Sequence, residues 1–162
     1  MSLQPVPIQN VPGVPDYTCT AFLPKSSDYC LLIPVINEGS RILTELGRAQ
    51  KAGVDRLVDI VICDGGSTDG SMNPDTLELY GVNTLLVKTG PGKQGAQLRM
   101  GLHFALQRGY EGVLTIDGND KDSIESVPLF LAKLKEGYDL IQGSRFIKGG
   151  REIGRASCRE RV

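Results

Sequence analysis

The residues best suited to chemistry lie in the stretch 58–71, VDIVICDGGSTDGS, where an apolar run ends in a turn of acids, hydroxyls and glycines. Asp64 and Asp69 can accept hydrogen bonds from a nucleobase or ribose, or share a cation. Around Gly66 and Ser67 the turn offers free backbone amides and allows a ligand to approach closely. The alternative is an ordinary turn in which Asp69 caps the next helix, because Asp, Ser and Gly are common in turns.

A second group of polar residues occupies the segment 117–122, DGNDKD. Asp117, Asn119 and Asp120 supply hard oxygen ligands suited to Mg²⁺ or Mn²⁺, with a diphosphate completing the coordination shell. An EF-hand is excluded because Lys121 stands where a third calcium ligand belongs. The alternative is a polar loop that caps the following helix.

A glycine-rich turn, GPGKQG at residues 90–95, matches the GxGxxG spacing of a dinucleotide-binding fingerprint, and Asp117 follows farther along the chain. A phosphate-binding P-loop is excluded because Gln94 rather than Ser or Thr follows Lys93. The dinucleotide-binding alternative stays open, although its motif would follow the third strand rather than the first.

Alternating strands and helices must position these groups. Apolar runs and helical periodicity predict strands at 29–36, 57–63, 83–88, 112–117 and 138–144, and helices at 38–51, 74–80, 94–108 and 123–137. In the first helix, the apolar residues are expected to pack on the sheet: Ile42, Leu43 and Leu46. The charged residues on the opposite face are expected to face water: Glu45, Arg48 and Lys51. Right-handed crossovers then require an α/β fold, with three α/β/α layers and a mainly parallel sheet.

Polar residues follow every predicted strand. Because the carboxyl ends of parallel strands share one edge of the sheet, these groups are expected to converge on one ligand. They are Asn37 and Glu38 after the first strand, Asp64 and Asp69 after the second, Lys93 after the third, residues 117–122 after the fourth, and residues 142–145 after the fifth.

Composition narrows the class of protein. The 162 residues are 40% hydrophobic and 23% charged, which is ordinary for one globular domain. A net charge of −1 and few aromatic residues give no basic footprint for nucleic acid. Neither a signal sequence nor a run of 18 apolar residues is found, and the four cysteines lack CxxC spacing and fit a reducing compartment. A cytoplasmic location is expected.

The two ends of the sequence differ from its middle in composition and in apolar periodicity. Residues 1–27 carry five prolines and are expected to form a mobile leader, and residues 28–150 form the predicted α/β domain. The string at 151–162 has no apolar periodicity and resembles a translated sequencing adapter, so we expect it to be non-native and the native chain to continue elsewhere.

An ordered set of motifs resembles the family 2 inverting glycosyltransferases of the GT-A fold, and among them the dolichol- and polyprenyl-phosphate sugar synthases. The motifs are PVINE at 34–38, DGGSTDGS at 64–71, GKQGAQLRMG at 92–101, DGND at 117–120 and GSRF at 143–146. The resemblance covers residues 28–150 and implies a GT-A domain that is incomplete at its C-terminus.

The resemblance also implies roles for individual residues. Asp117 matches the first acid of the DxD motif that binds metal and diphosphate, Asn119 or Asp120 completes the metal site, and Arg145 contacts an acceptor phosphate. One departure is that Gly65 follows Asp64, where the family commonly has a second acid. The residues assigned to the sugar nucleotide are Pro34, Asn37, Glu38, Asp64, Gly66, Ser67, Asp69, Lys93 and Arg99.

The implied reaction moves a hexose from UDP- or GDP-hexose to an acceptor, polyprenyl phosphate, with inversion and with Mg²⁺ or Mn²⁺. Such an enzyme would work at the cytosolic face of a membrane, and this chain alone is expected to be weak or inactive. A nucleotidyltransferase or a non-catalytic nucleotide-binding domain remains the alternative. Nucleotidyltransferases of this architecture usually have a glycine-rich basic loop after the first strand, where this chain has residues 37–39.

Overall fold

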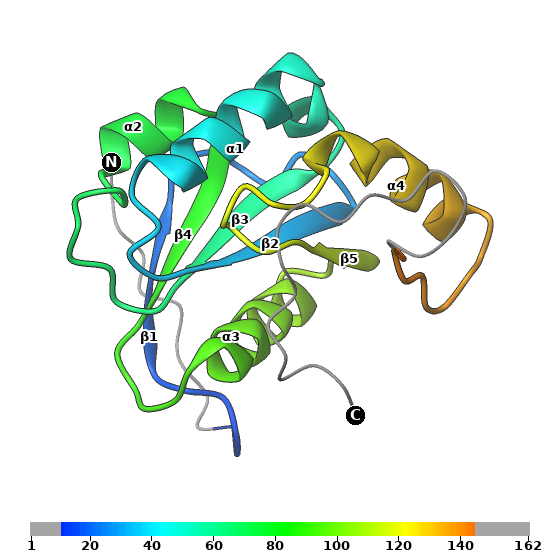
Figure 1. Ribbon diagram of the computed structural model, residues 1–162. Helices are drawn as coiled ribbons and strands as arrows, with labels where there is room; N and C mark the ends of the chain where they lie inside the picture. The colour runs from blue at the N-terminus through cyan, green and yellow to red at the C-terminus, as the bar shows by residue number, and fades with distance from the viewer. Residues whose placement is uncertain (1–10, 145–162) are drawn as a thin grey trace.

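The structure is a computed structural model that describes residues 11–144 (Figure 1). Five strands and four α-helices are present among them. The strands are β1 (Tyr17–Ala21), β2 (Tyr29–Val35), β3 (Asp59–Asp64), β4 (Val82–Lys88) and β5 (Gly112–Thr115). The helices are α1 (Ser40–Lys51), α2 (Pro74–Leu79), α3 (Gln94–Gln107) and α4 (Val127–Lys135), with short 3-10 helices at Val54–Arg56 and Ile124–Ser126.

The strands form one sheet in the order β1-β4-β3-β2-β5. Strands β2 to β5 are parallel, and β1 pairs antiparallel with β4 at one edge. The chain adds β3 and β4 on one side of β2 and then returns to place β5 on the other side. The strand order therefore reverses between β2 and β5, which is the position where open α/β sheets bind ligands.

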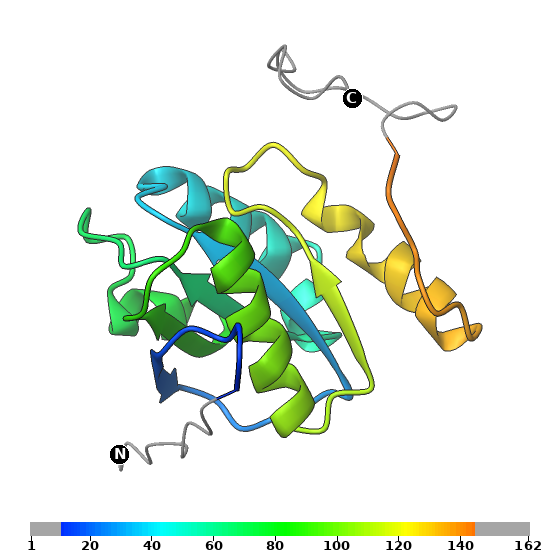
Figure 2. The ribbon, with the colours of Figure 1, turned by 90° about the horizontal axis from the view of Figure 1, so that it is seen from below.

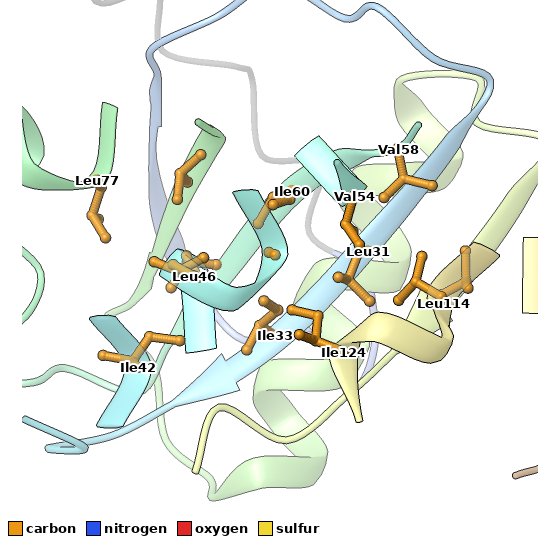
Figure 3. Close-up of a cluster of buried hydrophobic side chains, with 14 of the residues drawn as sticks. Leu31, Ile33, Ile42, Leu46, Val54, Val58, Ile60, Leu77, Leu114 and Ile124 are labelled. Atoms are coloured by element: carbon orange, nitrogen blue, oxygen red, sulfur yellow. The ribbon is translucent and has the colours of Figure 1, made fainter. Parts of the chain in front are cut away.

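Helices cover both faces of the sheet, as Figures 1 and 2 show: α1, α2 and α4 lie on one face and α3 on the other. Alternate residues of β2 enter the two cores, with Leu31 and Ile33 on the α1 side and Leu32 on the α3 side. Figure 3 shows the larger core, in which Ile42 and Leu46 of α1 lie over the sheet. The predicted three-layer fold with a mainly parallel sheet is confirmed.

Local signals explain where α2 begins. The side chain of Asn73 accepts a hydrogen bond from the backbone N–H of Thr76, and Pro74 occupies the first turn, where it costs no hydrogen bond. No helix within residues 11–144 is long and apolar enough to cross a membrane.

The predicted mobile leader, residues 1–27, is wrong over Tyr17–Ala21, which is strand β1. Tyr17 is buried under α3, and the strand pairs with β4 from Tyr17 opposite Lys88 to Ala21 opposite Thr84. The prolines flank this short edge strand and do not interrupt it, and edge strands tolerate such neighbours. Residues 1–10 lie outside the described part of the chain.

The strand predicted at 138–144 is also wrong, because these residues have no regular secondary structure. Tyr138 and Leu140 are exposed. A strand needs a neighbour to pair with, and a short apolar run does not supply one. The sheet still has five strands among the described residues, because β1 takes a place that the sequence did not predict. The segment expected to be non-native, 151–162, lies outside the residues that the structure describes.

Candidate functional site

The loops that follow β2 and β3 are joined into one unit at the carboxyl edge of the sheet. The backbone N–H of Asn37 donates to Ser67 Oγ (2.9 Å), and the N–H of Thr68 donates to Asn37 Oδ1 (2.8 Å). The N–H of Gly39 donates to Asp69 Oδ2 (2.8 Å). Asn37 has a φ of 51°, a left-handed conformation that Asn tolerates better than most residues. The prediction that these two loops come together is thus met by direct contacts.

Asp64 is the anchor of its own turn. It is 2% exposed, and its carboxylate accepts hydrogen bonds from the N–H groups of Gly66 (3.1 Å) and Ser67 (3.0 Å) and from Ser67 Oγ (2.6 Å). These contacts leave the Asp64 side chain inside the turn, so its observed part is to shape the loop.

Asp69 holds the other end of this turn and is exposed. Hydrogen bonds from the Ser71 hydroxyl (2.6 Å) and backbone N–H (3.0 Å), and from Gly39, lower the pKa of Asp69. The alternative that Asp69 caps the next helix is wrong, because Asn73 is the N-cap of α2.

Pro34 lies within the sheet, whereas Glu38 lies in the loop that follows β2. Pro34 is buried within β2, and its carbonyl lies 3.4 Å from the N–H of Gly118, so its place is inside the sheet beneath the edge. Glu38 lies in the loop beyond β2 and forms an ion pair with Arg41 of α1 (2.8 Å). Arg41 was not foreseen from the sequence.

Gln97 of α3 fastens the ends of β2 and β3 together. Its buried Nε2 donates to the carbonyl oxygens of Val35 (2.6 Å), the last residue of β2, and of Cys63 (2.8 Å), the last residue but one of β3. A Cβ at Gly65 would lie 3.1 Å from Gln97 Nε2 and 3.2 Å from Ile36. A side chain at position 65 would therefore crowd Gln97 and Ile36. A polar residue at an apolar helical position was the available signal.

Asp117 follows β5 and is exposed, and the Nε2 group of Gln94 donates to its Oδ1 (2.7 Å). Gln94 is the first residue of α3, so this bond connects the loop after β4 to the loop after β5. Lys93 is the N-cap of the same helix and is also exposed. The loops after β4 and β5 thus meet through side chains beside the point where the strand order reverses.

Two other polar side chains of the 117–122 segment have partners within the chain. Asn119 Oδ1 accepts the N–H of Lys121 (3.1 Å), and Asp120 Oδ1 accepts from Arg48 Nη1 (2.6 Å). Residues 11–144 contain no group of three His, Cys, Asp or Glu residues placed to hold a metal. Mg²⁺ in diphosphate sites often uses only one or two protein ligands. Asp117 and Asn119 fit that arrangement, whereas the Asp120 carboxylate is paired with Arg48.

The prediction that Glu45 and Arg48 face water is wrong. Glu45 is fully buried, and its Oε2 accepts the N–H of Asp120 (3.1 Å), while burial raises its pKa to about 7. Arg48 forms ion pairs with Asp120 and Glu125, and its hydrogen bonds lower the pKa of Glu125. The loop after β5 covers this side of α1, which the periodicity of α1 alone cannot reveal.

One predicted cation of the site, Arg99, is bonded to another part of the chain. Arg99 Nε donates to the carbonyl of Gly13 (2.5 Å) and so ties α3 to the segment before β1. Its assignment to the sugar nucleotide stays a prediction. Arg145 lies outside the described residues.

The glycine-rich turn at 90–95 has a packing role. A Cβ at Gly90 would lie 2.8 Å from the backbone nitrogen of Asp16, and the N–H of Gly90 donates to the Asp16 carbonyl (3.0 Å). The turn follows β4, two strands away from β2. Gly90 therefore leaves room for the backbone of the segment that leads into β1. This packing role weakens the dinucleotide-binding alternative.

Comparison with known proteins gives similarity to glycosyltransferases. No protein-family model matches the chain. It is 31% identical over 124 residues to glycosyltransferase AglJ of Haloferax volcanii, covering 76% of this chain and 38% of that protein. It is 30% identical over 123 residues to the polyprenol monophosphomannose synthase of Mycolicibacterium smegmatis, covering 74% and 46%.

A third relative is the undecaprenyl-phosphate mannosyltransferase of Micrococcus luteus, 29% identical over 134 residues, covering 81% of this chain and 54% of that protein. The chain thus spans about half the length of these relatives, or less. The similarity confirms the predicted resemblance to glycosyltransferases that act on polyprenyl phosphates: the chain is similar to a glycosyltransferase, a polyprenol monophosphomannose synthase and an undecaprenyl-phosphate mannosyltransferase.

Proposed function

We propose that this chain is the nucleotide-sugar-binding part of a glycosyltransferase that moves a hexose from UDP- or GDP-hexose to a polyprenyl phosphate. The observation that carries the proposal is the pairing of loops at the carboxyl edge of the sheet: Asn37 and Asp69 join the loops after β2 and β3, and Gln94 joins the loops after β4 and β5. These loops lie where an α/β sheet of this topology binds its ligand.

Within this arrangement the joined loops after β2 and β3 would hold the base and ribose. Asn37, Ser67 and Asp69 supply their polar groups, and Asp64 keeps their shape. Asp117 and Lys93, on the loops after β5 and β4, would face the diphosphate.

The residues present are compatible with Mg²⁺ or Mn²⁺ at Asp117 and Asn119. When bound, such an ion would neutralise charge that develops on the leaving diphosphate. Lys93 is a second source of positive charge, because it is exposed at the N-terminus of α3.

The chemistry of the acceptor fits a site without an evident general base. A phosphate oxygen is already anionic near neutral pH, so it can attack the anomeric carbon without losing a proton. The new C–O bond forms on the face opposite the breaking bond to the diphosphate, and the configuration inverts. Because the acceptor is a lipid, the reaction would take place at a membrane surface. Arg145 remains a proposed contact of the acceptor phosphate.

Ligand-observed NMR with GDP-mannose and UDP-glucose tests the donor assignment. We expect saturation transfer from the 162-residue chain to base and ribose protons of one donor. Added polyprenyl phosphate should release nucleoside diphosphate slowly or not at all, because the chain spans only part of its relatives. Release of pyrophosphate from a nucleoside triphosphate and a sugar phosphate would instead identify a nucleotidyltransferase.

A further inference from the structure

We propose that Arg48 is a positioning residue for the acidic turn 117–122, and that it holds Asp117 and Asn119 in place for a nucleoside diphosphate. This inference rests on the proposed function. It also gives Asp120 a structural role, because the Asp120 carboxylate forms the ion pair with Arg48.

The Arg48 guanidinium spans the turn and the 3-10 helix that follows it. Its Nη1 donates to Asp120 Oδ1 (2.6 Å), and its Nη2 donates to the carbonyl of Asp122 (3.1 Å). A two-pronged contact joins Nε and Nη2 to the two carboxylate oxygens of Glu125, at 2.7 and 2.6 Å. The planar guanidinium suits such bidentate contacts, which Lys cannot reproduce.

Glu45, one turn earlier on α1, strengthens the same attachment. Its buried carboxylate accepts the backbone N–H of Asp120 at 3.1 Å, so α1 holds both the backbone and the side chain of this residue. Asp120 has a φ of 60°, a left-handed conformation that a residue other than glycine adopts rarely. These contacts stabilise the backbone bend next to Asn119.

The turn is held at two further points, and both lie on the other side of Asp120 from Glu125. Gln94 of α3 donates to Asp117 Oδ1. Gly118 packs closely against β2, since a Cβ at this position would lie 2.8 Å from Val35 and 3.0 Å from Ile33. Loss of Arg48 would free the end of the turn that carries Asn119 while leaving Gly118 in place.

The test compares two ligands on the 162-residue chain by calorimetry: a nucleoside diphosphate with Mn²⁺, and the matching nucleoside alone. Both guanosine and uridine series are used. In Arg48→Ala we expect the affinity for diphosphate with Mn²⁺ to fall about 10- to 100-fold, as for outer partners of metal ligands. Affinity for the nucleoside should stay unchanged, because the loops after β2 and β3 are untouched. Equal losses for both ligands, or no loss, would overturn the inference.

Lys51→Ala is the matched control, because it removes an exposed cation from the same last turn of α1. It should bind both ligands like the wild type. Asp120→Ala should reproduce the Arg48→Ala effect, and the double variant should be no weaker than either single one, because the pair acts as a unit. Additive losses would mean that Asp120 is itself a ligand and would contradict the structural assignment.

Hydrogen exchange makes the test independent of ligand. Arg48→Ala, or Arg48→Lys if the alanine variant does not fold, should speed amide exchange in 117–122 and not in 64–71. Unchanged exchange in 117–122 would refute the positioning role. A wild-type chain that binds no nucleotide refutes the proposed function instead, whatever the exchange result.

Discussion

The carboxylates at the carboxyl edge of the sheet have different surroundings, although each of them follows a strand. Asp64 is buried in its own turn, Asp120 is paired with Arg48, and Asp117 is exposed beside Gln94. Sequence spacing predicted their shared location, because strand ends meet at one edge. It could not predict which carboxylate turns inward, since that depends on hydroxyl and guanidinium partners brought from elsewhere.

Removal of the Asp64 side chain tests its structural part. Asp64→Ala leaves the N–H groups of Gly66 and Ser67 without their partner, so we expect a loss of about 2 kcal/mol in the free energy of unfolding. Urea denaturation measures it. Asp75→Ala, in the exposed first turn of α2, is the control and should cost clearly less. Equal stability of Asp64→Ala and the wild type would show that the turn does not depend on this carboxylate.

The buried Glu45 predicts a dependence of stability on pH. Its pKa is raised from 4.5 to about 7 in the folded chain, so the folded state keeps a proton that the unfolded state releases. The contribution of Glu45 to the free energy of unfolding is therefore largest below about pH 4.5. It falls as the pH rises and is smallest above about pH 7.

Glu45→Gln removes this titration and keeps an oxygen that can accept the Asp120 N–H. Relative to the variant, the wild type should lose up to about 3 kcal/mol between pH 5 and pH 8, as a shift of this size implies. Chemical denaturation of both proteins across that range measures the difference. Parallel stability curves for the two proteins would refute the prediction.

At the level of helices and strands, the parallel frame was predictable and its edges were not. Strands β2 and β3 are buried on both faces, so their sequences are continuous apolar runs that stand out. Strand β1 is short, flanked by prolines and joined only to β4, so no local pattern indicated it. In the same way, α1 looked amphipathic, but the loop after β5 covers its Glu45 and Arg48 side.

Gln97 provides a test of how α3 fixes the site. Gln97→Leu would leave the carbonyls of Val35 and Cys63 without its two hydrogen bonds, so we expect a loss of about 2–3 kcal/mol in the free energy of unfolding. Gln107→Leu, an exposed position on the same helix, is the matched control. Thermal and urea denaturation measure both variants. If they lose the same small amount, Gln97 does not hold the strand ends together.

At the level of the whole molecule, residues 11–144 form a sheet with helices on both faces and with its candidate site at one edge. The three relatives, a glycosyltransferase, a polyprenol monophosphomannose synthase and an undecaprenyl-phosphate mannosyltransferase, match about three quarters of this chain or more, while the chain covers about half of their length or less. Under the proposed function, the described residues would serve donor recognition, and Arg145 stays a proposed contact of the acceptor phosphate.

The most direct test of the account is a calorimetric titration of the chain with GDP and with UDP, in the presence and absence of Mn²⁺. We predict saturable binding of at least one of them that Mn²⁺ strengthens, and loss of the Mn²⁺ effect in Asp117→Ala with the fold retained by circular dichroism. Failure of both nucleotides to bind, or a Mn²⁺ effect that persists without the Asp117 carboxylate, would contradict the account.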